Sequence, residues 1–212
     1  MYYTCMGKNQ VEQAVEKFFH GYSRISFGRG TLLIGADDNP TGISFIEKGF
    51  VKQYVISPKG QTLMLTIFKP GAFIPLTWGI NETPNTSNFE SLTDVTLYRA
   101  PREAVITFLR EHPDVLYDCT QRLLAGLSGM LERLQTLALD DAYEKVVRVI
   151  VYFGKLHLPF ALPHKEIAAW TGLARETVSL QMEELTRRGL IRYNGRTLEI
   201  INLTKLSQEE TR

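Results

Sequence analysis

Two charged side chains at adjacent positions, Arg175 and Glu176, open a stretch whose spacing predicts a helix with a polar outer face. Ser179, Leu180 and Glu183 follow at intervals that place them on the same face. Arginine donates hydrogen bonds to the major-groove edge of guanine, and glutamate accepts one from the amino group of cytosine. Such residues at the start of a helix are typical of a segment that reads base edges in DNA.

The flanking residues predict the frame that holds this helix. A first short helix from His164 is followed by Gly172, which supplies a flexible link to the second helix. Asn194-Gly195 between strand-like residues then predicts a β-hairpin, and the whole is typical of a winged helix-turn-helix. The alternative, a plain helical hairpin packed on a neighbour, leaves Arg175-Glu176-Thr177 unexplained. The apolar residues expected on the inner faces are Ile167, Ala168, Leu173, Val178, Leu185 and Leu190.

The composition is that of an ordinary globular protein of 212 residues, 44% hydrophobic and 22% charged. No apolar run is long enough to span a membrane, and the N-terminus lacks the order of a signal peptide, so we expect a cytoplasmic protein with no membrane partner. The net charge is +1, and residues 158–206 carry seven Lys and Arg against five Asp and Glu. DNA affinity must then come from a local arrangement of charge rather than from a broad basic face, and dimerisation would present that arrangement twice.

The N-terminal part has a different texture. Residues 9–20 predict a short amphipathic helix, and from Ser23 to Pro101 short apolar runs alternate with turns, which predicts an antiparallel barrel or jelly roll. The expected fold class is therefore α+β. Its expected parts are a β-barrel sensor domain over residues 1–112, a dimerisation helix over 113–139 and a winged-helix domain over 140–212.

The segment 113–138 carries apolar residues at the spacing of a coiled-coil seam. We expect a long helix that pairs with a second copy, because helix-turn-helix proteins normally read two half-sites with two-fold symmetry. The alternative is a single helix buried against its own barrel, and Leu124 and Leu131 are expected to face inward. Asp140-Asp141 ends the pattern, and one of the two is expected to cap a helix over 142–156. The predicted dimerisation residues are Leu116, Leu123, Leu127, Met130, Leu134 and Leu137.

Two sets of motifs together resemble one known family. The run from Glu166 to Ser179, followed by Gly189-Leu190-Ile191, is similar to the DNA-binding domain of the CRP/FNR regulators, the family of the cyclic-AMP receptor protein. The runs 43–51, 59–61 and 69–74 resemble the strand and turn signature of that family's cyclic-nucleotide-binding-like barrel. The resemblance implies a homodimeric, sequence-specific transcription regulator with double-stranded DNA and RNA polymerase as partners.

The resemblance also assigns roles to individual residues. Arg175 and Glu176 are expected to read bases, whereas His164, Lys165 and Thr177 are expected to contact phosphates. Relatives with the best-known operators carry an Arg at the position of Leu180, which offers only apolar contact, so we expect a different half-site. The complete set of expected DNA-binding residues is His164, Lys165, Arg175, Glu176, Thr177, Ser179 and Leu180.

The ligand positions of the family argue against cyclic AMP. Cyclic-nucleotide binders use a Gly-Glu pair for the ribose and an Arg-Ser or Arg-Thr pair for the phosphate, and here these positions are Pro75-Leu76 and Thr86-Ser87. Because a buried phosphate without a cationic partner is costly, we expect a small effector other than cyclic AMP. An effector-independent regulator and a nucleoid-type DNA binder are the alternatives. The candidate pocket residues, whose aromatic members could equally form the barrel core, are Phe73, Leu76, Trp78, Thr86, Ser87, Phe89, Met130 and Leu131.

Cofactor and enzyme chemistry find little support in the sequence. Cys5 and Cys119 are too few for an iron–sulfur cluster, and we expect reduced thiols. No metal-ligand spacing, nucleophile elbow or phosphate loop occurs, so we expect neither a metal site nor an enzyme, and any cofactor is unknown. The four histidines are expected as solvated or capping residues rather than haem ligands: His20, His112, His157 and His164.

Overall fold

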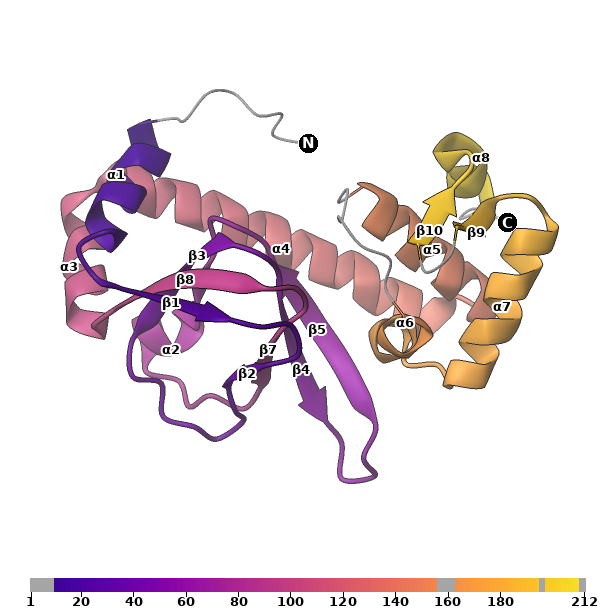
Figure 1. Ribbon diagram of the computed structural model, residues 1–212, viewed down its shortest axis with the longest axis horizontal. Helices are drawn as coiled ribbons and strands as arrows, with labels where there is room; N and C mark the ends of the chain where they lie inside the picture. Colours follow the sequence, from indigo (N-terminus) through magenta and orange to yellow (C-terminus); the bar gives the residue numbers. More distant parts are fainter. Residues whose placement is uncertain (1–9, 156–162, 195–196, 210–212) are drawn as a thin grey trace. The chain divides into compact units, whose positions relative to one another are not determined.

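The computed structural model describes residues 10–155, 163–194 and 197–209. Contacts divide the chain into two compact units. The first comprises Met1–Val55 and Leu65–Gly126, and the second comprises Ile56–Met64 and Leu127–Arg212 (Figure 1). Within the described ranges no helix is both long and apolar enough to cross a membrane.

The first unit is built on two antiparallel sheets (Figure 1). Gly49 occupies the turn after β3 with a φ of +87°, and a Cβ there would lie 2.2 Å from the Asp94 carbonyl oxygen, so only glycine allows this close approach. The predicted barrel is confirmed. One sheet has the order β1 (Ser23–Phe27), β8 (Val95–Ala100), β3 (Ile43–Lys48), β6 (Phe73–Ile74), and the other β2 (Leu32–Ile34), β7 (Asn88–Ser91), β4 (Val51–Ile56), β5 (Thr62–Phe68).

Helices close this unit around an aromatic core. The predicted N-terminal helix is α1 (Gln10–Phe19), which buries Val15 and Phe19 because its apolar residues share one face. Phe19 stacks on Phe45 of β3 with ring centroids 5.2 Å apart. Two further helices, α2 (Leu76–Asn81) and α3 (Arg102–Glu111), complete the unit, and α3 adds Val105, Phe108 and Leu109 to the same core.

The predicted long helix is α4 (Pro113–Leu139), 27 residues long (Figure 1). Val115 and Cys119 are the only buried residues along this fully described helix, and both belong to the core of the first unit. The expectation that Leu124 and Leu131 face inward is wrong, since they are 59% and 54% exposed. Cys119 is the last buried residue of α4, and both leucines lie beyond it on the exposed part of the helix.

The second unit contains the winged helix-turn-helix, with helices α5 (Ala142–Lys155), α6 (His164–Thr171), α7 (Arg175–Arg187) and α8 (Leu203–Gln208) and strands β9 (Ile191–Asn194) and β10 (Thr197–Ile200). Asp141 caps α5 as predicted: its carboxylate accepts from the Glu144 N–H at 2.9 Å, and Glu144 accepts from the Asp141 N–H at 2.9 Å. Gly172 ends α6 in the left-handed region with φ +70°. The hairpin pairs as predicted, although Gly195 of its turn lies outside the described residues.

Candidate nucleic-acid interface

The second helix of the helix-turn-helix, α7, has one buried and one exposed face. Val178 and Leu185 are fully buried, as their spacing predicts, whereas Arg175, Glu176 and Leu180 are exposed. Leu180 is 63% exposed, so its apolar side chain is available for contact from outside the domain. The exposed face therefore presents one cation, one carboxylate and one apolar side chain within two turns, as the sequence predicts.

The charges at the two ends of α7 are in different situations. Near its C-terminus Arg187 forms two hydrogen bonds with Glu184 at 2.7 and 2.9 Å. At its N-terminus Arg175 and Glu176 make no side-chain hydrogen bond or ion pair with any described residue. Ala174 at the N-cap offers no side-chain acceptor, so the first N–H groups of the helix also remain open to an anion. This end of α7 can therefore meet a phosphate backbone and base edges together.

His164 lies between α7 and the first strand of the wing. Its Nδ1 is 2.9 Å from Ser179 Oγ, and its Nε2 is 2.7 Å from the Tyr193 hydroxyl. Burial lowers the pKa of His164, the positive charge of Arg175 lowers it further, and Glu183 opposes the shift. Both ring nitrogens thus have protein partners, and the phosphate contact expected of His164 from the sequence stays a prediction.

The other two expected phosphate contacts have different exposures. Lys165 is exposed at the start of α6, with its ammonium 4.0 Å from Glu166, and its phosphate contact stays a prediction. Thr177 is half-buried in the first turn of α7. Sequence reasoning missed Tyr193, although an aromatic residue in the strand directly after the second helix was an available signal.

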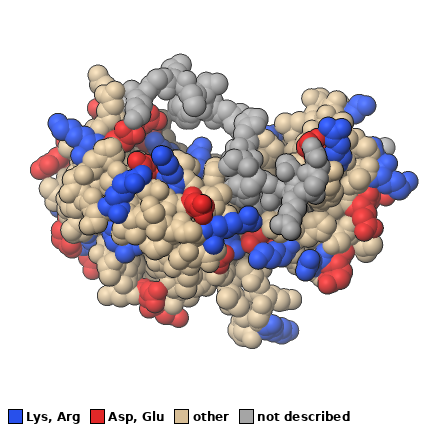
Figure 2. All heavy atoms as spheres, in the orientation of Figure 1, with Lys and Arg blue, Asp and Glu red and all other residues tan. Residues whose placement is uncertain are grey.

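The surface charge agrees with the expectation of local rather than broad complementarity. On the face drawn in Figure 2, Lys and Arg side chains alternate with Asp and Glu side chains, and no wide basic field appears. In the second unit, the wing residue Arg192 is itself paired with Glu199 at 2.7 Å. On the face that Figure 2 shows, the charges are mixed, as expected where affinity depends on a few well-placed contacts.

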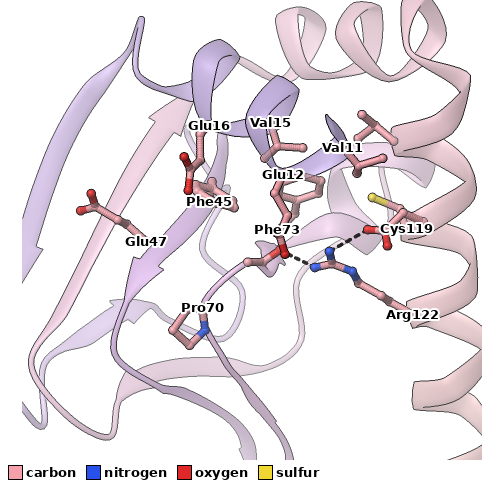
Figure 3. A pocket seen from close by; sticks show the side chains of 13 residues that line it. Val11, Glu12, Val15, Glu16, Phe45, Glu47, Pro70, Phe73, Cys119 and Arg122 are labelled. Carbon is pink, nitrogen blue, oxygen red and sulfur yellow. Dashed lines mark hydrogen bonds and ion pairs between the residues drawn. The ribbon is translucent and has the colours of Figure 1, made fainter. Parts of the chain in front are cut away.

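A cavity of about 240 Å³ lies in the first unit between α1, β3, the segment 70–73 and the start of α4 (Figure 3). Arg122 lines it, but its guanidinium pairs with Asp118 at 2.7 Å and donates to the Gly71 carbonyl at 2.9 Å. Three further carboxylates, Glu12, Glu16 and Glu47, also line the cavity. Its apolar walls come from Val11, Val15, Phe45, Pro70, Phe73 and Val115, and Cys119 completes the lining.

The structure does not gather the candidate effector residues in this cavity. Phe73 lines it, but Phe89 belongs to a separate core cluster of the first unit. Both rings are buried, so the alternative that the aromatic residues form the barrel core holds for them. Thr86 is exposed and Ser87 is buried, and Leu76 and Trp78 pack on the cluster that contains Phe73. Met130 and Leu131 lie exposed on α4.

The predicted seam residues form an apolar stripe on α4. Leu116, Leu123, Leu127 and Leu134 are between 42% and 63% exposed, Met130 is 57% exposed, and Leu137 is half-buried. Gly126 and Gly129 have open space where a Cβ would stand. Exposed apolar stripes of this length are characteristic of interfaces.

Among the described residues, no group of three or more His, Cys, Asp or Glu side chains is arranged so that it could hold a metal ion. Cys119 is a buried free thiol, and burial raises its pKa to about 11. His112 closes α3 through a contact between its Nδ1 and the Phe108 carbonyl at 2.9 Å, which fits the expected capping role. Cys5 and His157 lie outside the described residues.

Comparisons with known proteins cover both units. The family described as Cyclic nucleotide-binding domain matches residues 24–112, and the family described as Crp-like helix-turn-helix domain matches residues 121–209. A CRP-like cAMP-activated global transcriptional regulator of Mycobacterium tuberculosis is 24% identical over 197 residues, covering 87% of this chain and 86% of the relative. Transcriptional regulator SdrP of Thermus thermophilus is 25% identical over 172 residues, covering 76% of this chain and 80% of the relative.

Solved structures share the fold. The c-di-GMP responsive global regulator CLP of Xanthomonas campestris has a TM-score of 0.76 at 20% identity, with 90% of this chain and 99% of that chain covered. A transcriptional regulator of the CRP/FNR family from Thermus thermophilus has a TM-score of 0.74 at 23% identity, with 90% and 99% covered. These likenesses confirm the predicted architecture of barrel, long helix and helix-turn-helix.

Proposed function

The chain belongs to the CRP/FNR family of DNA-binding transcription regulators, and from that premise we propose that it acts as a cytoplasmic homodimer that reads a two-fold symmetric operator. The observation that carries this proposal is the exposed N-terminal face of α7, where Arg175 and Glu176 have no side-chain partner among the described residues. A guanidinium and a carboxylate held side by side can distinguish guanine from cytosine in the major groove. Enzymatic activity forms no part of the proposal.

Dimerisation is supported by the stripe on α4. Its exposed leucines include Leu123, Leu127 and Leu134, and leaving them in water costs about 25 cal/mol for each Å² of apolar surface. A second copy of the same helix, related by two-fold symmetry, buries the stripe against an identical one. The open space over Gly126 and Gly129 lets two backbones approach closely. Two linked reading heads then bind two half-sites with a gain in effective concentration.

Control by a small molecule other than cyclic AMP is the second part of the proposal. The cavity beneath α1 has four carboxylates in its lining. Its one guanidinium, on Arg122, already pairs with Asp118 and donates a hydrogen bond to the Gly71 carbonyl. A cyclic phosphate there would lack a cationic partner and face like charges. The relative in Mycobacterium tuberculosis is cAMP-activated, but the Gly-Glu and Arg-Ser positions of cyclic-nucleotide binders are Pro75-Leu76 and Thr86-Ser87 here.

We propose RNA polymerase as the protein partner, on the ground that the matched family consists of transcription regulators. A nucleoid-type packaging role is disfavoured by the net charge of +1, since packaging proteins depend on extensive phosphate neutralisation.

Selection from random duplex DNA tests the proposed function. We expect the full-length protein to enrich one two-fold symmetric site whose half-site centres lie about one helical turn, roughly 10 base pairs, apart. Enrichment without a shared motif, at a level equal to bulk DNA, would contradict sequence-specific reading. In a parallel thermal-unfolding assay, cyclic AMP should leave the midpoint unchanged, and a concentration-dependent rise would contradict the effector proposal.

A further inference from the structure

Three side chains from three different elements form one hydrogen-bonded chain in the second unit. Tyr193 is in β9, the first strand of the wing, His164 opens α6, and Ser179 lies in α7. The Tyr193 hydroxyl is 2.7 Å from His164 Nε2, and His164 Nδ1 is 2.9 Å from Ser179 Oγ. Ser179 in turn donates to the carbonyl of Arg175 at 3.1 Å. These hydrogen bonds therefore connect the wing to Arg175, the residue that begins the reading helix.

The protons in this series of hydrogen bonds can be placed by counting donors. A serine hydroxyl has one proton, and Ser179 gives it to the Arg175 carbonyl, so its oxygen accepts from His164 Nδ1–H. The neutral imidazole then has its lone pair on Nε2, which accepts from the Tyr193 O–H. Burial raises the pKa of Tyr193 and lowers that of His164, so both groups stay in the protonation states that this direction requires.

The charged groups around His164 favour the same neutral state. Arg175 of α7 repels a proton on the ring, and Glu183 of the same helix acts in the opposite direction but more weakly than Arg175. Each hydrogen bond of this series joins an uncharged donor to an uncharged acceptor, so all three donate in the same direction, from the wing toward Arg175. A single tautomer of His164 satisfies all three hydrogen bonds at once.

We propose that Tyr193 and His164 are positioning residues for base readout, which lock the wing strand to the first turns of the reading helix through the Nδ1–H tautomer of His164. This inference rests on the DNA-reading function proposed above. A wing and a helix that are fixed to each other before binding lose less conformational freedom on the operator. Non-specific binding depends on phosphate contacts, which tolerate small changes in the angle between wing and helix. Loss of the lock should therefore reduce discrimination rather than general affinity.

The first test compares Tyr193→Phe, which removes one hydroxyl, with Lys165→Ala, which removes a phosphate-contacting charge. For Tyr193→Phe we expect the affinity for the selected operator to fall about fivefold to tenfold, the scale of one lost hydrogen bond. The affinity for scrambled DNA and the salt dependence of binding should not change. For Lys165→Ala we expect equal losses on both DNAs and a salt slope smaller by about two, one for each copy in the dimer. Equal losses on both DNAs for Tyr193→Phe would overturn the positioning role.

The second test reads the tautomer directly by imidazole ¹⁵N nuclear magnetic resonance of the full-length protein, with His164→Gln identifying the His164 signals. We expect the proton on Nδ1 in the wild type and a redistribution toward Nε2 in Tyr193→Phe. A wild-type proton on Nε2 would overturn the proposal even if the Tyr193 variant failed to fold. If instead wild-type protein did not distinguish the selected operator from scrambled DNA, the DNA-reading function itself would fail, whatever the tautomer.

Discussion

The guanidinium of Arg133 lies 4.3 Å from the ring centroid of Trp170 and donates to the backbone carbonyl of the same residue at 2.7 Å. Trp170 is in the last turn of α6, where helical carbonyls lack intrahelical partners. The long helix α4 is thus fixed to the first helix of the helix-turn-helix by one side chain within the second unit. Burial lowers the pKa of Arg133 to about 10, so the group remains charged at neutral pH.

Replacement of Arg133 by Met should destabilise the second unit by about 1–3 kcal/mol, because the stacking and the hydrogen bond to Trp170 are both lost. Arg133→Lys keeps the charge but not the planar group that stacks and donates together, so an intermediate loss is expected. Urea unfolding followed by tryptophan fluorescence measures both. Equal stability of Arg133→Met and wild type would show that this contact does not hold the two helices together.

The start of α7 should determine base preference. Arg175→Ala and Glu176→Ala should each cost about 1–3 kcal/mol per half-site on the selected operator and relax the preference at one base pair of each half-site. Arg187→Ala is the matched control, because Arg187 is on the same helix but is held by Glu184. Fluorescence anisotropy with operator and scrambled duplexes measures the difference. Losses of the same size on both duplexes would argue against base contacts.

Leu180 should define one base pair of the half-site through apolar contact, for instance with a thymine methyl group. Leu180→Arg should transfer the preference at that pair to guanine, with a change of about 1–3 kcal/mol between the two bases. Repeating the selection with the variant measures this shift. An unchanged motif would place Leu180 outside the base-reading surface.

Cys119 should behave as a packing residue and not as a redox sensor. Its pKa is raised to about 11 by burial, with Asp118 adding to the shift and Arg122 opposing it. Thiolate is therefore scarce at pH 8, and iodoacetamide should modify Cys119 far more slowly in the native protein than in urea. Because the folded pKa is raised, the thiol favours the folded state below pH 9 and loses this contribution as pH rises toward 11. Rapid native modification, measured by peptide mass spectrometry, would contradict the buried assignment.

The elements that could be predicted from the sequence are those with strong periodicity. The apolar spacing of α7, including Val178 and Leu185, predicted its buried face, and Asp141 was recognisable as a cap. In contrast, α8 is only six residues long and was not predicted, although Asn202 caps it by accepting from the Lys205 N–H at 2.9 Å. Short helices carry too few apolar repeats to give a period.

The details of the candidate site were less accessible, because they depend on contacts between residues far apart in the sequence. His164 and Tyr193 are 29 positions apart, and nothing local to either predicts their hydrogen bond. The same holds for the cavity beneath α1, whose lining includes both Val15 and Cys119, which are far apart in the sequence. Leu131 was expected to face inward but is exposed. Periodicity identifies an apolar face of a helix but not the surface that packs against it.

The central claim, that two copies joined along α4 read one operator, is tested most directly by the operator affinity of Leu127→Asp. The variant places like charges face to face in the apolar seam, at a cost on the order of several kcal/mol, and should dissociate the dimer. Gln121→Asp is the control, an exposed position on the same helix about 120° round from Leu127. We predict that Leu127→Asp loses at least about a hundredfold in affinity for the full operator, the effective-concentration gain of a second half-site, while Gln121→Asp binds as wild type. A Leu127→Asp protein that is monomeric by light scattering and still binds the full operator as tightly as wild type would contradict the account.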